Sequence, residues 1–228
     1  MTSQSFDLRD STQLIPAARA ARQAIARGEL IVLPTDTVYG VGADAFTPAA
    51  VQRLLDAKGR GRQQPPPVLV GSVDAMRALV AEVPEPIERL VERFWPGALT
   101  IVLPARASLS WDLGETHGTV AVRMPADPHA RELLLETGPM AVSSANLTGQ
   151  AAAVQVQDAI RMLGESVAVY LDGGPSTTGI ASTIIDATRL VGDGDGTVSI
   201  LRRGALPTED LREVLGDLLV DLPPDADA

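Results

Sequence analysis

The chain has 228 residues, of which 45% are hydrophobic and only 3% aromatic, so it is long enough for one α/β domain with an aliphatic core. Its formal net charge of -10 argues against a protein that coats nucleic acid with its whole surface. It contains no cysteine and only two histidines, which excludes disulfides, zinc–thiolate sites and clusters of several histidines.

The first part of the chain alternates helical and extended patterns. Residues 1–12 are polar and predict an N-terminal arm, either loose or a short strand. Helical spacing over Leu14–Arg27 stops at Gly28, and the apolar run Leu30–Leu33 predicts a buried strand. After a loop over Thr35–Phe46, we expect in chain order a helix from Thr47 to Ala57, a strand over Val68–Gly71, helices over Val73–Val83 and Pro86–Phe94, and a strand over Leu99–Leu103.

The second part of the chain continues this mixture. In chain order we expect a strand over Thr119–Met124, a helix from Asp127 to Gly138, a strand over Met140–Ser143, a helix over Val156–Leu163, strands over Val167–Leu171, Thr183–Asp186 and Val198–Leu201, and a helix over Pro207–Leu219. Because strands sometimes follow one another directly, the predicted fold class is α/β with a twisted open mixed sheet and flanking helices, and a strict doubly wound parallel sheet fits less well.

The domain organisation is simple. Residues 13–220 show no internal repeat and no linker, so they predict a single domain, and the acidic, proline-bearing residues 221–228 predict a disordered tail. No run reaches the roughly 18 apolar residues of a membrane span. Met1–Asp10 also lacks the apolar core of a signal peptide. We therefore expect a cytoplasmic protein that does not associate with membranes.

The loop Pro34–Asp44 is the first candidate site. It follows a buried strand, which is where α/β sheets commonly bind ligands. Thr37 lies there with a second threonine, a carboxylate and two glycines, and such a loop can hold a small polar molecule. The alternative is a glycine-rich turn whose threonine and aspartate side chains cap their own backbone.

Lys58, Arg60 and Arg62 place three cations within five residues, directly after a predicted helix. Lys58 is the only lysine among 19 lysine and arginine residues. Either the position needs a compact ammonium group in place of a planar guanidinium, or a lysine remains by chance at a solvated helix end. The cations and their intervening glycines resemble a phosphate cradle, although the sequence has no Walker A motif. In the alternative interpretation they only complement the dipole at the helix end.

Further candidates lie at the ends of later strands. Period-two alternation puts Thr119 and Arg123 on one strand face, where Arg123 can meet a ligand or form an edge salt bridge. The loop Ser143–Gly149 supplies neutral hydrogen-bonding groups for phosphate or ribose, or forms an Asx turn. Ser182 and Arg202 lie at two more strand ends. No catalytic triad or metal cluster competes, so the pattern favours nucleotidyl or phosphoryl transfer, in which cations stabilise charge on phosphate oxygens.

Seven sequence blocks carry a family resemblance. They are PTDTVYGVGADA at Pro34–Ala45, KGR at Lys58–Arg60, WPGALT at Trp95–Thr100, VAVRMP at Val120–Pro125, SANLTG at Ser144–Gly149, ASTIID at Ala181–Asp186 and LRRG at Leu201–Gly204. In this order they resemble the YrdC-type threonylcarbamoyl-AMP synthases, in their short single-domain form. The resemblance implies an open α/β sheet around a large concave cationic cavity, with Mg²⁺ bound together with ATP and no metal ligand assigned among protein side chains.

The resemblance also implies residue roles, carried over by position. Lys58 and Arg60 would be catalytic; the ATP-binding residues would be Lys58, Arg60, Gln64, Thr119, Ser144, Asn146 and Arg202, and the threonine-binding residues Thr37, Arg123 and Ser182. Two positions depart from the family pattern. Gln64 lies in a run that differs from the usual R-P-x-x-x-P-L, and Leu69 stands where some members carry a polar threonine contact.

The implied activity is formation of L-threonylcarbamoyladenylate and pyrophosphate from L-threonine, bicarbonate or CO₂, and ATP. The product would serve tRNA threonylcarbamoyladenosine modification and would be handed to the tRNA threonylcarbamoyltransferase machinery. One alternative is a non-catalytic protein that binds double-stranded RNA or ribosomes; weak RNA binding is also implied, but the net charge of -10 disfavours it as the main activity. A carbamoyl-adenylating relative that acts on carbamoyl phosphate is a third interpretation, disfavoured because such proteins carry large extra domains.

Overall fold

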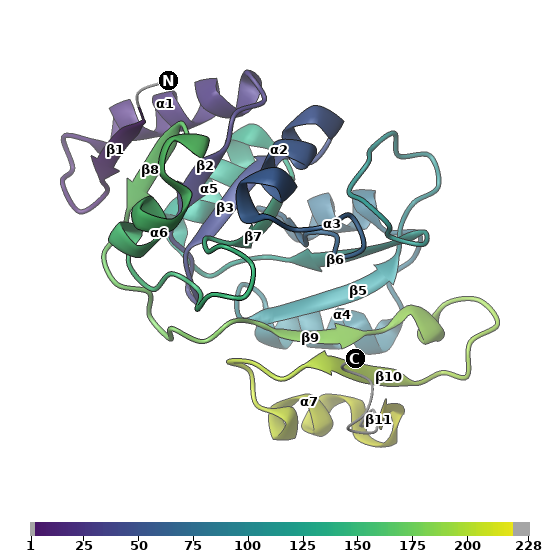
Figure 1. The fold of residues 1–228 in the computed structure, drawn as a ribbon. Helices are drawn as coiled ribbons and strands as arrows, with labels where there is room; N and C mark the ends of the chain where they lie inside the picture. The colour runs from purple at the N-terminus through teal and green to yellow at the C-terminus, as the bar shows by residue number, and fades with distance from the viewer. Residues whose placement is uncertain (1–2, 221–228) are drawn as a thin grey trace.

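The computed structural model describes residues 3–220. They form one 11-stranded mixed sheet in the order β1-β8-β2-β3-β7-β4-β6-β5-β9-β10-β11, with helices packed against it (Figure 1). The predicted open mixed α/β sheet is thereby confirmed. The strands are β1 (Gln4–Asp7), β2 (Ile31–Leu33), β3 (Gly40–Asp44), β4 (Val68–Leu69), β5 (Leu99–Pro104), β6 (Thr119–Arg123), β7 (Met140–Ser144), β8 (Val169–Asp172), β9 (Thr183–Asp186), β10 (Val198–Arg202) and β11 (Leu219–Val220).

Seven α-helices and three short 3-10 turns complete the part of the chain that the structure describes. The helices are α1 (Leu14–Ala26), α2 (Pro48–Lys58), α3 (Val73–Leu79), α4 (Glu85–Phe94), α5 (Pro128–Thr137), α6 (Val156–Leu163) and α7 (Thr208–Leu215), and the 3-10 turns are Gly164–Ser166, Thr188–Leu190 and Gly216–Leu218. None of these helices is long and apolar enough to cross a lipid bilayer.

Helices cover both faces of the sheet around β2 and β8. Side chains of α1 and α5, such as Ala21 and Leu134, pack in one buried cluster with Ile31 and Leu33. Val32 between them turns to the opposite face, where it packs in a cluster with α2 and α6. Because both faces of β2 are buried, its sequence is continuously apolar.

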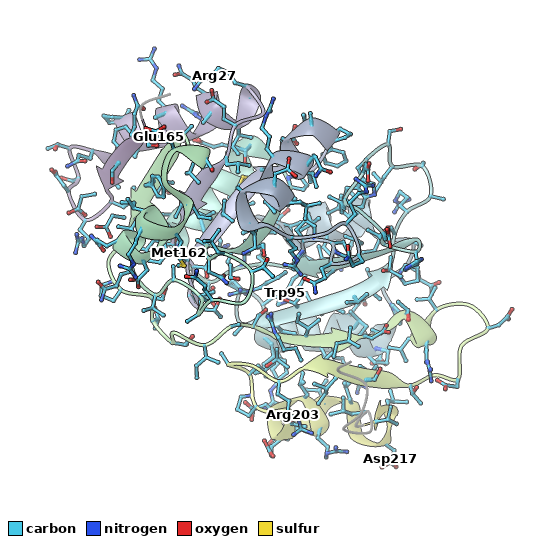
Figure 2. The ribbon with its side chains drawn as sticks, in the orientation of Figure 1. Arg27, Trp95, Met162, Glu165, Arg203 and Asp217 are labelled. Atoms are coloured by element: carbon cyan, nitrogen blue, oxygen red, sulfur yellow. The ribbon has the colours of Figure 1, made fainter. Side chains whose placement is uncertain are left out.

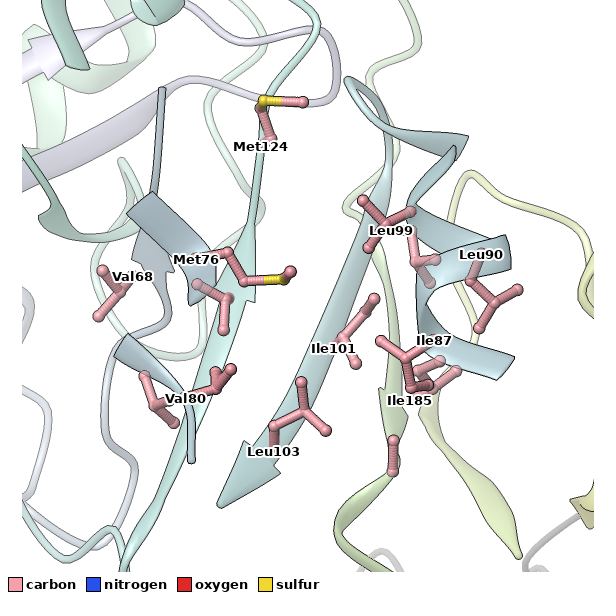
Figure 3. Packing of buried hydrophobic residues seen from close by; sticks show 14 of the residues in the cluster. Val68, Met76, Val80, Ile87, Leu90, Leu99, Ile101, Leu103, Met124 and Ile185 are labelled. Carbon is pink, nitrogen blue, oxygen red and sulfur yellow. The ribbon is translucent and has the colours of Figure 1, made fainter. Parts of the chain in front are cut away.

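The sheet around β5 and β6 is organised differently. Helices α3, α4 and α7 pack on one face, where residues such as Ile87 of α4 contact a cluster that includes Ile101 and Leu103 (Figure 3). Alternate residues of β5, Thr100 and Val102, point to the opposite face. That face is the floor of a cavity.

One predicted loop contains a strand that the sequence analysis missed. β3 lies within Thr35–Phe46 and pairs antiparallel with β2 and β7. Its two glycines interrupt the apolar pattern by which strands are usually found. A Cβ added to Gly40 would lie 2.6 Å from Cγ1 of Val142, so a side chain there would collide with β7. This pairing brings the loop before β3 to the end of β7.

Several predicted boundaries also change. The helix predicted over Val73–Val83 ends at Leu79, because Val80 forms a β-bridge with Ala105. The last predicted helix ends at Leu215, and Leu219–Val220 instead pairs with β10. The N-terminal arm contains the short strand β1, which pairs parallel with β8. The tail predicted over residues 221–228 lies outside the described residues.

Candidate functional site

A cavity of about 390 Å³ lies over β5, β6 and β9, on the face opposite α3, α4 and α7. Alternation along β6 turns Thr119, Ala121 and Arg123 toward the cavity, while Val122 is fully buried in the core cluster. The expectation that Thr119 and Arg123 share one strand face is therefore confirmed. Period-two geometry thus places a cation and a hydroxyl on the same cavity floor.

Arg123 is held by two segments of the chain, one at Gly97 and one at Asp36 and Thr37. Its Nε donates to the carbonyl oxygen of Gly97 (2.9 Å), its Nη1 to Oγ1 of Thr37 (2.8 Å) and its Nη2 to Oδ1 of Asp36 (2.7 Å). Burial lowers the pKa of Arg123, and the charge of Asp36 opposes that shift. A guanidinium has five N–H groups, so two remain for an anionic ligand such as a carboxylate.

The hydroxyl of Thr37 is oriented by this arrangement. Thr35 Oγ1 donates to the carbonyl oxygen of Val38 (2.6 Å) and lies 3.0 Å from Oγ1 of Thr37. Since the Thr35 proton is already used, the Thr37 hydroxyl donates to Thr35 while it accepts from Arg123. Thr37 lines the cavity although its side chain is buried.

Arg60 lies at the end of β7. Its Nη1 donates to Oγ of Ser143 (3.0 Å), and its buried Nε has no hydrogen-bond partner among the described residues. Burial lowers the pKa of Arg60. A buried N–H without a hydrogen-bond partner destabilises the folded protein by about 1–3 kcal/mol. An anionic ligand that accepts a hydrogen bond from Arg60 Nε would remove this cost.

Arg202 approaches the cavity from β10. Its Nε and Nη2 donate to the carbonyl oxygen of Ser182 (3.1 and 2.7 Å), and Nη2 also lies 3.1 Å from Ser182 Oγ. Burial lowers the pKa of Arg202, and the charges of Arg123 and Arg60 lower it further. Three guanidinium groups thus act on one cavity, and within residues 3–220 only Arg123 among them forms an ion pair. The neighbouring Arg203 lies toward α7 (Figure 2).

Lys58 contacts the loop that follows β7, and its assignment to the ATP phosphates stays a prediction. Its side chain is buried but does not line the cavity. Nζ donates to the backbone carbonyls of Ser144 and Asn146, the latter at 2.7 Å. Burial lowers the pKa of Lys58 to about 8, and the charge of Arg60 contributes to the shift. In this structure the ammonium fixes the loop after β7.

The other predicted site residues divide into two groups. Thr37, Arg60, Thr119, Arg123, Ser144, Ser182 and Arg202 line the cavity together. Gln64 is exposed beside it, and Asn146 is buried behind it, where Nδ2 donates to the carbonyl oxygens of Leu147 and Gln150. Their assignment to ATP remains a prediction. Lys58, Gln64 and Asn146 thus lie outside the lining that the other seven residues share.

Some lining residues were not singled out as ligand-binding. Leu69, which departs from the family pattern, forms part of the wall. Glu115, Thr116 and His117 come from the segment between β5 and β6 and line the cavity near its opening. In the sequence, Gly114 and Gly118 flank that segment, and glycines commonly mark turns. Within residues 3–220, no group of three histidine, cysteine or acidic side chains is arranged to hold a metal ion.

Comparisons with known proteins point in one direction. The Sua5/YciO/YrdC family model, described as telomere recombination, matches residues 23–204. A Mycobacterium leprae protein with the provisional name threonylcarbamoyl-AMP synthase is 52% identical over 211 residues, which are 92% of this chain and 93% of that protein. The threonylcarbamoyl-AMP synthase of Pyrococcus abyssi is 36% identical over 203 residues, covering 89% of this chain.

A solved structure agrees with the sequence relatives. The crystal structure of P. abyssi Sua5 complexed with L-threonine superposes with a TM-score of 0.85 at 32% identity. The match covers 98% of this chain but 63% of that one, and the chain likewise spans 58% of the length of the P. abyssi sequence relative. The described residues therefore correspond to one part of the longer archaeal protein.

Proposed function

The chain belongs to the Sua5/YciO/YrdC family, and on that basis we propose that it is an L-threonylcarbamoyladenylate synthase, a nucleotidyltransferase that supplies tRNA threonylcarbamoyladenosine modification. Its substrates are L-threonine, bicarbonate or CO₂, and ATP. The observation that carries this proposal is the convergence of Arg60, Arg123 and Arg202 on one cavity of an otherwise acidic protein. The product passes to the tRNA threonylcarbamoyltransferase machinery.

Threonine binds where Arg123 and Thr37 meet. The two remaining N–H groups of Arg123 donate to the α-carboxylate, and Asp36 holds the guanidinium through Nη2. The relative P. abyssi Sua5 has been solved with L-threonine, which supports an amino-acid site in this fold. Ser182 is the third predicted contact and lies in the same cavity.

The reaction joins two anions. The amine nitrogen of threonine forms a bond to the carbon of CO₂ and loses a proton, which gives a carbamate. A carbamate oxygen then attacks the α-phosphorus of ATP, and the bond to the bridging oxygen breaks to release pyrophosphate. Two unit charges 4 Å apart repel by about 4 kcal/mol at an effective dielectric of 20, so the cations that Arg60 and Arg202 place at the cavity offset a substantial part of the barrier.

Magnesium enters this scheme with the nucleotide. Glu115 is the only carboxylate among the residues that line the cavity, and the described residues contain no ligand cluster for a metal. The side chains present do not form a magnesium site of their own. Mg²⁺ therefore enters as part of the MgATP substrate.

The experiment that tests the proposal follows pyrophosphate. Purified protein is incubated with ATP, Mg²⁺ and bicarbonate, with and without L-threonine, and we expect pyrophosphate release only when threonine is present. Serine and valine serve as control amino acids, since each retains part of the threonine side chain. Release that is independent of threonine, or no release at all, would overturn the synthase assignment.

A further inference from the structure

The loop between β2 and β3 carries two residues that hold Arg123. The two strands pair antiparallel, so residues 34–39 form the end of a hairpin. Within this hairpin end, Asp36 and Thr37 both accept hydrogen bonds from the Arg123 guanidinium. The position of the guanidinium in the cavity therefore depends on what holds the hairpin end in place.

Tyr39 is the last residue of the hairpin end, and its side chain is fully buried. Its hydroxyl donates to the carbonyl oxygen of Gly174 (2.6 Å) and accepts the N–H of Gly173 (3.0 Å), in the segment that leads from β8 to β9 (Figure 1). Burial, together with the negative charge of Asp172, raises the pKa of Tyr39, so the hydroxyl stays protonated and remains a donor. The side chain thus joins two parts of the chain that are far apart in the sequence.

Asp172 completes a small network of hydrogen bonds around this hydroxyl. Its Oδ1 accepts the N–H of Gly174 (2.8 Å) and lies 3.3 Å from the hydroxyl oxygen of Tyr39. Two consecutive glycines restrict the backbone little. Contacts such as those of Tyr39 and Asp172 are therefore needed to fix the segment after β8.

The segment after β8 packs directly on the hairpin end. A Cβ added to Gly173 would lie 2.9 Å from the side chain of Pro34, so the Gly173 backbone lies against the proline ring. Farther along, the N–H of Thr178 donates to the carbonyl oxygen of Asp36 (3.3 Å), and its hydroxyl lies 3.4 Å from the carbonyl oxygen of Thr37. The segment thus contacts the hairpin end at its first residue and at both residues that hold the guanidinium.

The Tyr39 hydroxyl acts on these contacts and has no proton to spare for a ligand. Tyr39 is among the residues that line the cavity, but a hydroxyl has a single proton, and here it is donated to Gly174. Any influence of this hydroxyl on the substrate therefore passes through the backbone of the segment after β8 and through the hairpin end.

We propose that Tyr39 is a positioning residue for the amino-acid side of the cavity. Its hydroxyl holds residues 172–174 against the hairpin end, and the hairpin end presents Asp36 and Thr37 to Arg123. Removal of the hydroxyl loosens this loop, so binding at the guanidinium weakens while the contacts of ATP are unaffected. The inference rests on the proposed function, because it takes L-threonine as the ligand at Arg123.

A second buried tyrosine provides a matched control. Tyr170 lies in the same buried cluster as Tyr39, its hydroxyl donates to the carbonyl oxygen of Gly164 (2.7 Å), and it does not line the cavity. Tyr39→Phe and Tyr170→Phe each remove a hydroxyl that is bonded to a glycine carbonyl, so each should lower the thermal midpoint of unfolding. Only Tyr39→Phe disturbs the hairpin end.

The test is calorimetric titration of L-threonine, and separately of ATP, into wild type and both variants. We expect Tyr39→Phe to weaken threonine binding at least fivefold and to change ATP binding less than twofold, and Tyr170→Phe to leave both affinities within twofold of wild type. Pyrophosphate release by Tyr39→Phe should show a KM for threonine raised to the same extent and a kcat within threefold. Threonine binding that weakens equally in the two variants, or in neither, would overturn the inference.

Gly173→Ala tests the same contact without touching the tyrosine. Its Cβ would collide with the Pro34 side chain and push the segment after β8 away from the hairpin end. We expect the same selective loss of threonine affinity, at least fivefold, as in Tyr39→Phe. If Gly173→Ala folds and binds threonine as tightly as wild type does, the segment after β8 does not position the loop.

Amide hydrogen exchange needs neither substrate nor turnover. Exchange of the peptide that spans residues 34–38 should be at least fivefold faster in Tyr39→Phe and within twofold of wild type in Tyr170→Phe. A wild type that binds no threonine would remove the synthase assignment, and exchange in this peptide would still decide whether Tyr39 fixes the hairpin end. Unchanged exchange in Tyr39→Phe would show that it does not.

Discussion

Asp36 lies behind Arg123 with respect to the cavity. Its Oδ1 is 2.7 Å from Nη2 of Arg123 and also accepts the backbone N–H of Ala126 at 2.9 Å. Arg123 lines the cavity and Asp36 does not. The carboxylate therefore compensates the buried guanidinium and fixes its plane, while the second N–H of Nη1 and the second N–H of Nη2 stay available to a ligand.

The first prediction concerns this pair. Asp36→Asn keeps the shape of the side chain and removes its charge, which loses a charge-assisted hydrogen bond of roughly 1.5–3 kcal/mol. We expect the KM for threonine to rise about tenfold or more and the KM for ATP to change less than twofold, measured by pyrophosphate release.

Arg123→Ala, which removes the cation itself, should lower kcat/KM for threonine at least about tenfold, equivalent to roughly 1.4 kcal/mol.

The matched control for Asp36→Asn is Asp195→Asn, which removes a carboxylate from an exposed ion pair with Arg189. Exposed pairs contribute about 0–1 kcal/mol, so its kinetics should equal those of wild type. If Asp36→Asn folds and keeps its KM for threonine, Asp36 does not position Arg123.

The alternation of side chains along strands made part of this site predictable from the sequence. Thr119 and Arg123 share a face because side chains two apart on a strand point the same way. The Asp36–Arg123 pair was not predictable, since it joins residues 87 positions apart. No local pattern shows that a loop aspartate and a strand arginine will meet.

Lys58 and β3 show two other reasons why sequence patterns fall short. The cluster of cations after α2 predicts a phosphate cradle, but the direction of each side chain depends on its contacts with residues 143–146, which are distant in the sequence. The Lys58 ammonium turns to backbone carbonyls while Arg60 turns to Ser143 at the cavity. In β3, Gly40 and Gly42 are needed for close packing and hide the strand from hydrophobicity patterns.

The second prediction concerns the pH dependence of ATP binding. The Lys58 ammonium bridges the carbonyls of Ser144 and Asn146, and burial lowers its pKa to about 8. The protonated form therefore prevails below about pH 8 and is lost as the pH rises through that value. If the charge holds the loop for ATP, affinity should fall about tenfold between pH 7 and pH 9.

Calorimetric titration of ATP without threonine measures this effect, because the amine of threonine titrates in the same range. Lys58→Met fills the same volume without the charge, so its ATP affinity should be weaker at pH 7 and flat up to pH 9. Lys58→Ala should lower pyrophosphate release at least about tenfold. A wild-type affinity that stays constant across this range would show that the charge state of Lys58 does not control the loop.

The third prediction concerns Gly204, which follows Arg202 by two residues. A Cβ added there would lie 2.3 Å from the carbonyl oxygen of Ala181 and 2.4 Å from the carbonyl carbon of Ser182. Both neighbours are backbone atoms, so Gly204→Ala must displace the end of β10. We expect the affinity for inorganic tripolyphosphate to fall at least fivefold, because Arg202 moves with the strand end.

Gly192→Ala is the control for Gly204→Ala. A Cβ added to Gly192 would have no atom within 4 Å. Because φ of Gly192 is 69°, the substitution would cost only backbone strain, about 1–2 kcal/mol. It should lower thermal stability and leave tripolyphosphate binding unchanged. Equal tripolyphosphate affinities in the two folded variants would show that Gly204 does not set the position of Arg202.

The fourth prediction concerns the buried hydroxyl pair of Thr100 and Ser182. Their oxygens are 2.8 Å apart, and the Thr100 side chain is almost fully buried. Ser182→Ala leaves the Thr100 hydroxyl without its partner, which should cost about 1–3 kcal/mol in the free energy of unfolding. Thr100→Val together with Ser182→Ala removes both polar groups, so urea denaturation of the double variant should recover most of that loss. A double-mutant cycle in which the two losses simply add would contradict a direct bond between the hydroxyls.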